Sequence, residues 1–196
     1  MSVVSEPRHS LVATQVVFFA CILACVVVDP SHQADSNGIS YYGVHAPTLP
    51  LVAIGYVVGS IGVWRTARYV QLLDAPAVVG PGLRLVALAL PAELLTPFNH
   101  GPFLNWTHMG IGVVIGVTQM LAGTVLMVRR PGPLTRATFL VQLVGGLIAA
   151  ASLPSWGINQ MILGEVIFAL GFSGCLVRWT YETPVESASR AQIEAP

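Results

Sequence analysis

Lysine is absent from this chain, and charged residues of every kind are scarce. Only 9% of the 196 residues are charged, whereas soluble domains contain about 25%. So few charges cannot cover the surface of a water-soluble globule of this size. Hydrophobic residues make up 54% of the chain, and its mean hydropathy is +0.72. The composition therefore predicts an integral membrane protein, and the use of arginine alone hints at a GC-rich, bacterial genome.

The usual signatures of binding and catalysis are also missing. The formal net charge is zero, which argues against nucleic acid as a partner. The sequence contains no Walker loop, no GxSxG, no HExxH and no histidine pair at haem-ligand spacing within one helix. We therefore predict no catalytic residue, no cofactor and no metal site. The pattern leans away from an enzyme without excluding one.

Cysteine is rare, and its positions do not suggest a cross-link or a metal site. Cys21, Cys25 and Cys175 all lie within apolar segments, and none of the spacings is of the CxxC type. Cys21 and Cys25 are one helical turn apart, which favours packing over a disulfide. We expect all three to be buried or to face lipid.

Six apolar segments predict membrane-spanning helices, which need about 20 residues; the second of them approaches that length only with residues 48–50 and the stem of Arg65. They are residues 11–28, 51–64, 78 or 83 to 98, 106–128, 135–153 and 158–177. The predicted fold class is all-α, a polytopic bundle of six transmembrane helices. Its parts are an N-terminus at residues 1–10, a transmembrane domain at 11–178 and a polar, poorly ordered tail at 179–196.

The first apolar segment has an alternative reading as a signal peptide. The residues before Cys25 even resemble a loose lipoprotein cleavage site. The residues that follow, Val26–Val28, stay apolar, where a mature lipoprotein would turn polar. We therefore favour an uncleaved helix.

The arginines set the orientation. With six helices, all nine basic residues fall on one side of the membrane, and the opposite loops at residues 29–50, 99–105 and 154–157 hold none. Cytoplasmic loops carry the excess of basic residues. The sequence therefore predicts a multi-pass plasma-membrane protein with both termini in the cytoplasm.

The long outer loop at residues 29–50 contains three prolines, Gly38 and Gly43, which we expect to prevent any regular helix. Tyr41 and Tyr42 in this loop suit the membrane interface, where a ring lies among headgroups and its hydroxyl stays wet.

Within the helices, two glycine pairs predict faces that another helix can approach closely, and three glutamines predict hydrogen bonds between helices. The pairs are Gly55 with Gly59 and Gly112 with Gly116; the glutamines are Gln15, Gln119 and Gln142.

Residues 91–110 hold the densest group of ionisable residues at one membrane face. Glu93 lies inside an apolar helix, His100 and His108 flank the following turn, and Glu165 occupies a matching depth in the last helix. A charge in the middle of a membrane costs several kcal/mol, so such residues usually face the bundle interior. We expect the four side chains to share an outward-facing polar site. The alternative is a protonated glutamic acid that donates a hydrogen bond between helices.

A second polar group lies in the outer loop and contains Asp29, His32, Asp35 and His45. Histidine with carboxylate can bind a transition metal or pass protons near neutral pH. The spacings match no strong metal motif, and the alternative is a set of interfacial residues on a wet loop. No metal ligand is assigned.

Two short motifs resemble a known group of proteins. They run from Gly38 to Gly43 (GISYYG) and from Asn105 to His108 (NWTH). The chain resembles the bacterial six-helix membrane proteins classed as domain of unknown function 998 and, more remotely, the DRAM-type family. In these, an Ile-Ser motif ends the first outer loop and a histidine opens the fourth helix. The resemblance implies a six-helix bundle in the plasma membrane and no established activity.

Three classes of function follow. The leading hypothesis is a non-catalytic protein that associates with membrane lipids, with another membrane protein or with a second copy of itself through its glycine faces. The first alternative is a small proton-linked transporter or permeation protein that uses Glu93 and Glu165. The second is an outward-facing metal- or lipid-dependent enzyme that uses His100, His108 and a carboxylate. The bundle interior discriminates between them. A water-filled cavity that reaches Glu93 and Glu165 favours transport, and a lateral groove near His108 favours lipid binding or lipid chemistry. Tight packing with both carboxyls hydrogen-bonded to neighbouring helices favours a structural role.

Overall fold

The chain is all-helical, as its composition predicts. The computed structural model describes residues 5–72, 75–153 and 158–182, and these contain eight α-helices and no strand. The long helices are α1 (Ser5–Val28), α4 (Leu49–Leu72), α5 (Val79–Leu94), α6 (Pro102–Arg129), α7 (Pro133–Ala151) and α8 (Met161–Glu182). The short ones are α2 (Gln33–Asn37) and α3 (Ile39–Tyr42).

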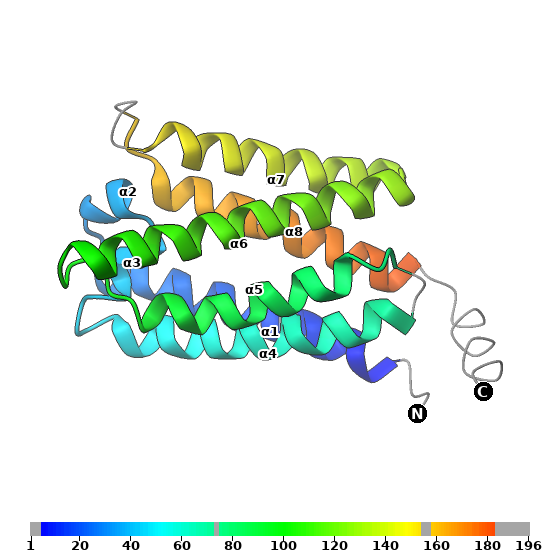
Figure 1. The fold of residues 1–196 in the computed structure, drawn as a ribbon, viewed down its shortest axis with the longest axis horizontal. Helices are drawn as coiled ribbons and strands as arrows, with labels where there is room; N and C mark the ends of the chain where they lie inside the picture. Colours follow the sequence, from blue (N-terminus) through cyan, green and yellow to red (C-terminus); the bar gives the residue numbers. More distant parts are fainter. Residues whose placement is uncertain (1–4, 73–74, 154–157, 183–196) are drawn as a thin grey trace.

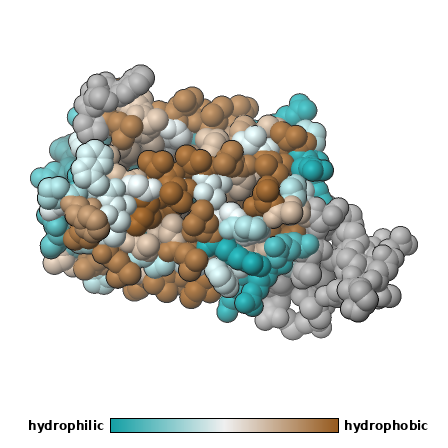
Figure 2. Space-filling view, viewed as in Figure 1, coloured by the Kyte–Doolittle hydropathy of each residue, from teal (hydrophilic) through white to brown (hydrophobic). Residues whose placement is uncertain are grey.

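Five of the described helices, α1, α4, α6, α7 and α8, are long and apolar enough to cross a membrane. The sixth long helix, α5, has only 16 residues. On the visible face, apolar side chains cover most of the middle of the molecule, and hydrophilic ones gather toward its two ends (Figure 2). This distribution is compatible with a multi-pass membrane protein.

The long helices lie side by side with their axes roughly aligned, and α2 and α3 sit at the end opposite the start of α1 and the end of α8 (Figure 1). Packing is closest between α7 and α8, between α1 and α4, and between α4 and α5. Helix α6 lies against α5 and also touches α7 and α8. The bundle thus has two closely packed groups, α1–α4–α5 and α7–α8, which α6 connects.

The arginines gather at one end of this bundle, which we call the arginine end. Contacts between helix termini show this arrangement directly. Arg65 Nη1 donates to Ser10 Oγ at 3.3 Å, which joins α4 to α1. The Arg130 guanidinium lies 4.1 Å from the Trp179 ring centroid, which joins the end of α6 to that of α8. The one-sided arginine distribution expected from the sequence is therefore present in the fold, with Arg190 outside the described residues.

The expectation that residues 29–50 hold no regular helix is wrong. Helices α2 and α3 form between Pro30 and Gly43, and Gly38 separates them with a φ of +67°. The placement of Tyr41 and Tyr42 at the membrane interface is also wrong, because their exposed fractions are only 4% and 1%. Helix α3 turns both rings inward, where they pack edge to face 5.3 Å apart.

Three of the long helices also begin or end at other residues than expected. Helix α1 begins at Ser5 and α8 ends at Glu182, so helix extends beyond both ends of the predicted 11–178 region. The C-terminal extension is packed: Trp179 and Thr180 are buried. Helix α5 ends at Leu94 rather than at residue 98, close to Pro97, which disfavours helix at the residue before it. The expected turn at residues 154–157 and the tail from residue 183 lie outside the described residues.

The first glycine pair is used within the chain. A Cβ on Gly55 would lie 3.1 Å from Cys21 Cβ, and one on Gly59 would lie 3.3 Å from the Phe18 ring. Helix α1 therefore covers this face of α4. The second pair does not act as one face, because Gly112 lies against Glu93 whereas nothing lies within 4 Å of a Cβ on Gly116.

The closest helix contact lies elsewhere, between α7 and α8. A Cβ on Gly145 would collide with the backbone at Phe168, and Cβ atoms on Gly164 and Gly171 would collide with the backbone at Ala149 and Gln142. Here two helix backbones touch directly, which only glycine allows. We call these three glycines the α7–α8 seam.

The expected hydrogen bonds between helices are largely confirmed. Ser173 Oγ donates to Gln15 Oε1 at 2.6 Å, which joins α8 to α1. Gln142 Nε2 donates to the Gln119 carbonyl at 2.9 Å, which joins α7 to α6. Gln119 thus takes part through its backbone rather than its side chain.

Candidate functional site

Glu93 is held between three helices near the end opposite the arginines. Its carboxyl is hydrogen-bonded by the Tyr56 hydroxyl of α4. On the other side it lies against α6, where a Cβ on Gly112 would be 3.1 Å from Glu93 Oε1. The carboxyl therefore points into the bundle, as the cost of exposing it to lipid predicts.

His108, on the first turns of α6, fastens two other elements. Its Nδ1 lies 3.3 Å from the Glu93 carbonyl, and its Nε2 lies 2.7 Å from Ser40 Oγ. A carbonyl can only accept a hydrogen bond, so Nδ1 carries the proton and the neutral ring accepts the Ser40 hydroxyl at Nε2. The imidazole is 9% exposed. It joins the end of α5 to α6 through the Glu93 carbonyl, which also accepts the Thr96 N–H at 3.2 Å, and it ties α3 to α6 through Ser40.

Glu165 of α8 holds α3, the helix that His108 also contacts. The Ile39 N–H at the start of α3 donates to Glu165 Oε2 at 2.6 Å. Gly38 lies directly over this carboxyl, and a Cβ there would collide with it. The carboxyl oxygen thereby satisfies one of the first N–H groups of α3, which have no partner within that short helix.

Together these contacts attach the outer segment, residues 33–42, to α6 and α8. Ser40 is tied to α6 by His108, and Ile39 is tied to α8 by Glu165. Helix α2 also packs against α8. The two carboxyls are close enough to interact electrostatically. Glu93, Glu165 and His108 thus lie at one end of the bundle, and α3 lies between His108 and Glu165.

The cavity at this site is small. It has a volume of about 10 Å³ and is lined by Ser40, Tyr56, Glu93 and His108 with apolar neighbours. That volume is at the lower limit for one water molecule. Glu165 is not among its lining residues, so this cavity does not join the two carboxyls.

His100 does not belong to this group. It is exposed, and its Nδ1 pairs with the neighbouring Asn99 Oδ1 at 2.7 Å. Gly101, which has a φ of +97°, lies between this residue and the start of α6. The expected four-residue site is therefore reduced to three.

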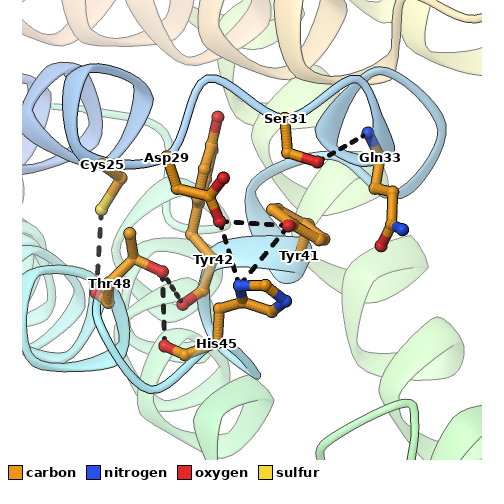
Figure 3. A network of polar contacts seen from close by, with 8 residues as sticks. All are labelled: Cys25, Asp29, Ser31, Gln33, Tyr41, Tyr42, His45 and Thr48. Atoms are coloured by element: carbon orange, nitrogen blue, oxygen red, sulfur yellow. Dashed lines mark hydrogen bonds and ion pairs between the residues drawn. The ribbon is translucent and has the colours of Figure 1, made fainter.

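The outer-loop candidates divide into two pairs. Asp29 Oδ2 lies 3.0 Å from His45 Nδ1 and accepts the Tyr41 hydroxyl at 3.1 Å (Figure 3). This contact joins the residue after α1 to the turn before α4. His32 and Asp35 form a separate exposed pair, with 3.3 Å between His32 Nδ1 and Asp35 Oδ2.

None of these groups has the composition of a metal centre. Within the described part of the chain, no three His, Cys, Asp or Glu side chains gather closely enough to hold a metal ion. Cys21, Cys25 and Cys175 are free thiols. The Asp29 pair and the His32 pair each offer at most two such ligands.

Sequence reasoning missed Tyr56, Ser40 and the Ile39 N–H. In the sequence, Tyr56 is one more residue of an apolar segment. Nothing in a sequence marks a particular backbone N–H as a hydrogen-bond donor to a side chain. Ser40 lies in the Gly38–Gly43 motif that marks the resemblance above, and its place in that motif is the one signal available.

Comparison with known proteins does not assign the chain to a family. No protein-family model, curated protein or solved structure matches the chain. The resemblance to the domain of unknown function 998 stays a prediction.

Proposed function

We propose that this protein is a six-span plasma-membrane protein with both termini in the cytoplasm, and that it works without catalysis by associating with membrane lipids or other membrane proteins. In this proposal α5 is the sixth span. Glu93, His108 and Glu165 serve to hold the outer segment in place, so that the outer face of the bundle keeps one shape.

The observation that supports this proposal is how the two carboxyls are used. Glu165 accepts the backbone N–H of Ile39, and Glu93 accepts the Tyr56 hydroxyl. The adjoining cavity of about 10 Å³ holds at most one water molecule. A carrier needs room for its substrate beside its titrating groups, whereas a structural carboxyl needs a partner, and here each carboxyl has one.

Two substitutions at Glu165 test this role. Glu165→Gln keeps an oxygen that can accept the Ile39 N–H, so we expect its thermal stability in detergent to stay close to that of the wild type. Glu165→Leu leaves that N–H without a partner, which costs about 1–3 kcal/mol for a buried group. We expect a lower melting temperature and faster proteolysis within residues 33–42 for the leucine variant only.

The proton-linked alternative remains the second candidate because two interacting carboxyls share one end of an apolar bundle. It predicts the opposite pattern. Purified protein in liposomes would carry protons, and Glu165→Gln would abolish the flux while leaving the fold intact. Either result would defeat the structural proposal.

A further inference from the structure

A groove opens at the arginine end of the molecule, far from the carboxyl site. It has a volume of about 470 Å³, within the range of ligand-binding clefts, about 300–1,000 Å³. Its walls are the chain just before α5 and the last turns of α6: Pro76, Ala77, Val78, Thr124, Val125, Val128 and Arg129. Apart from Thr124 and Arg129, every lining residue is apolar.

The groove exists because α5 and α6 end at different heights. Gly82 of α5 faces Thr118 of α6, with 3.3 Å from a Cβ on Gly82 to Thr118 Cγ2. From that level α5 extends only to Val79, about 4.5 Å, whereas α6 extends to Arg129, about 16 Å, at 1.5 Å per residue. The last turns of α6 therefore have no helix of α5 beside them.

The most exposed apolar side chains of this groove are valines. Val78 is 66% exposed and Val128 is 64% exposed. Arg129, the last residue of α6, is exposed at the same place. An apolar groove with a cation at its mouth complements a molecule that has an apolar chain and an anionic head.

We propose that this groove binds one anionic phospholipid, with an acyl chain between residues 76–78 and the last turns of α6 and its phosphate at the Arg129 guanidinium. Charge complementarity selects the occupant: the groove lies among the basic residues that gather at this end, where anionic headgroups are attracted. The proposal rests on the membrane embedding in the proposed function, and it is independent of the role given to Glu93 and Glu165.

Native mass spectrometry of the full-length protein tests this binding, with phosphatidylglycerol or phosphatidylcholine of equal chain length added to delipidated protein. One arginine near a phosphate contributes about 1 kcal/mol, so we expect phosphatidylglycerol to be retained about five-fold better. Arg129→Gln should remove that preference, and Ala77→Trp, which fills the groove, should lower retention of both lipids. Arg136→Gln is the matched control, because Arg136 is exposed at the same end and does not line the groove.

Four results would overturn the proposal. The first is equal retention of the two lipids by the wild type. The second is a loss of preference in Arg136→Gln as large as in Arg129→Gln, which would indicate a diffuse charge effect. The third is a dimer that Ala77→Trp converts to monomer, which would make a second copy the occupant. The fourth is a several-fold gain in lipid retention on deletion of residues 183–196, which would make the tail the occupant. None of these results bears on the Glu165 variants, so the two proposals fail separately.

Discussion

Gly38 and Glu165 lie 127 positions apart in the chain, yet each fixes the other. Gly38 adopts a φ of +67° and a ψ of −156°, a conformation that residues with a Cβ rarely adopt. The missing side chain leaves the space that the Glu165 carboxyl fills, and the turn presents the Ile39 N–H to that carboxyl. The backbone conformation of Gly38 and its contact with the Glu165 carboxyl therefore both require the absence of a Cβ.

We therefore expect Gly38→Ala to destabilise the protein. The backbone strain is worth about 1–3 kcal/mol, and the new methyl group displaces the Glu165 carboxyl. The measurement is thermal unfolding in detergent, together with proteolysis of the outer segment. Gly110→Ala is the control, because nothing lies within 4 Å of a Cβ there and alanine favours helix over glycine. Equal melting temperatures for the two variants would contradict the close contact with Glu165.

At the scale of single residues, the sequence predicts the two glutamates of the site better than it predicts the groups that donate hydrogen bonds to them. Glu93 and Glu165 are recognisable because a carboxyl in an apolar helix is costly. Their partners are a tyrosine from another helix and a backbone N–H from a distant loop, and only the folded chain brings these together. His100 is the reverse case: its spacing suits the site, but its side chain is exposed and pairs with Asn99 instead.

At the scale of helices, the α7–α8 seam is the contact most sensitive to side-chain size. Gly164 and Gly171 are seven residues apart, two helical turns, so both lie on one face of α8. The pattern search for glycines four apart selects Gly55 with Gly59 and Gly112 with Gly116 instead. Glycine spacing alone does not predict which face meets another backbone, because that depends on which helices become neighbours.

We expect Gly164→Val to weaken the α7–α8 pair strongly. A Cβ at this position collides with the backbone at Ala149, and backbone cannot move aside as the end of a flexible side chain can. Overpacking of this kind costs about 1–3 kcal/mol. The check is the melting temperature in detergent, with Gly116→Ala as the control because its surroundings are open. A melting temperature equal to that of the control would mean that the two helices are not in backbone contact.

For the whole molecule, α5 decides the topology. Among the described helices, five have the length and composition expected of a span. Helix α5 runs from the arginine end to the end of the bundle that holds Glu93 and Glu165 (Figure 1). If α5 crosses the membrane, the termini lie on the same side; if it does not, every later segment is inverted relative to that scheme. The sequence predicts the six long helices but not α2 and α3, and neither it nor the fold decides whether a 16-residue helix crosses the membrane.

Reporter fusions on both sides of α5 test this crossing. We expect fusions after Val78 and Arg130 to report the cytoplasm, and fusions near Gly38 and Gly101 to report the outside, in line with the placement of the arginines. A fusion after Arg178 should again report the cytoplasm. An external signal after Arg178, or the same signal after Val78 and Gly101, would rule out six spans.

The unequal lengths of α5 and α6 have a consequence for the surrounding bilayer. At 1.5 Å per residue, the 16 residues of α5 cover about 24 Å and the 28 residues of α6 about 42 Å, against a hydrocarbon core about 30 Å thick. A span that is too short is accommodated by local thinning, and one that is too long by tilting. The bilayer would therefore be thinner beside α5 than on the opposite side of the bundle. Lipids with shorter acyl chains would then collect beside α5, and lipids with longer chains elsewhere around the protein.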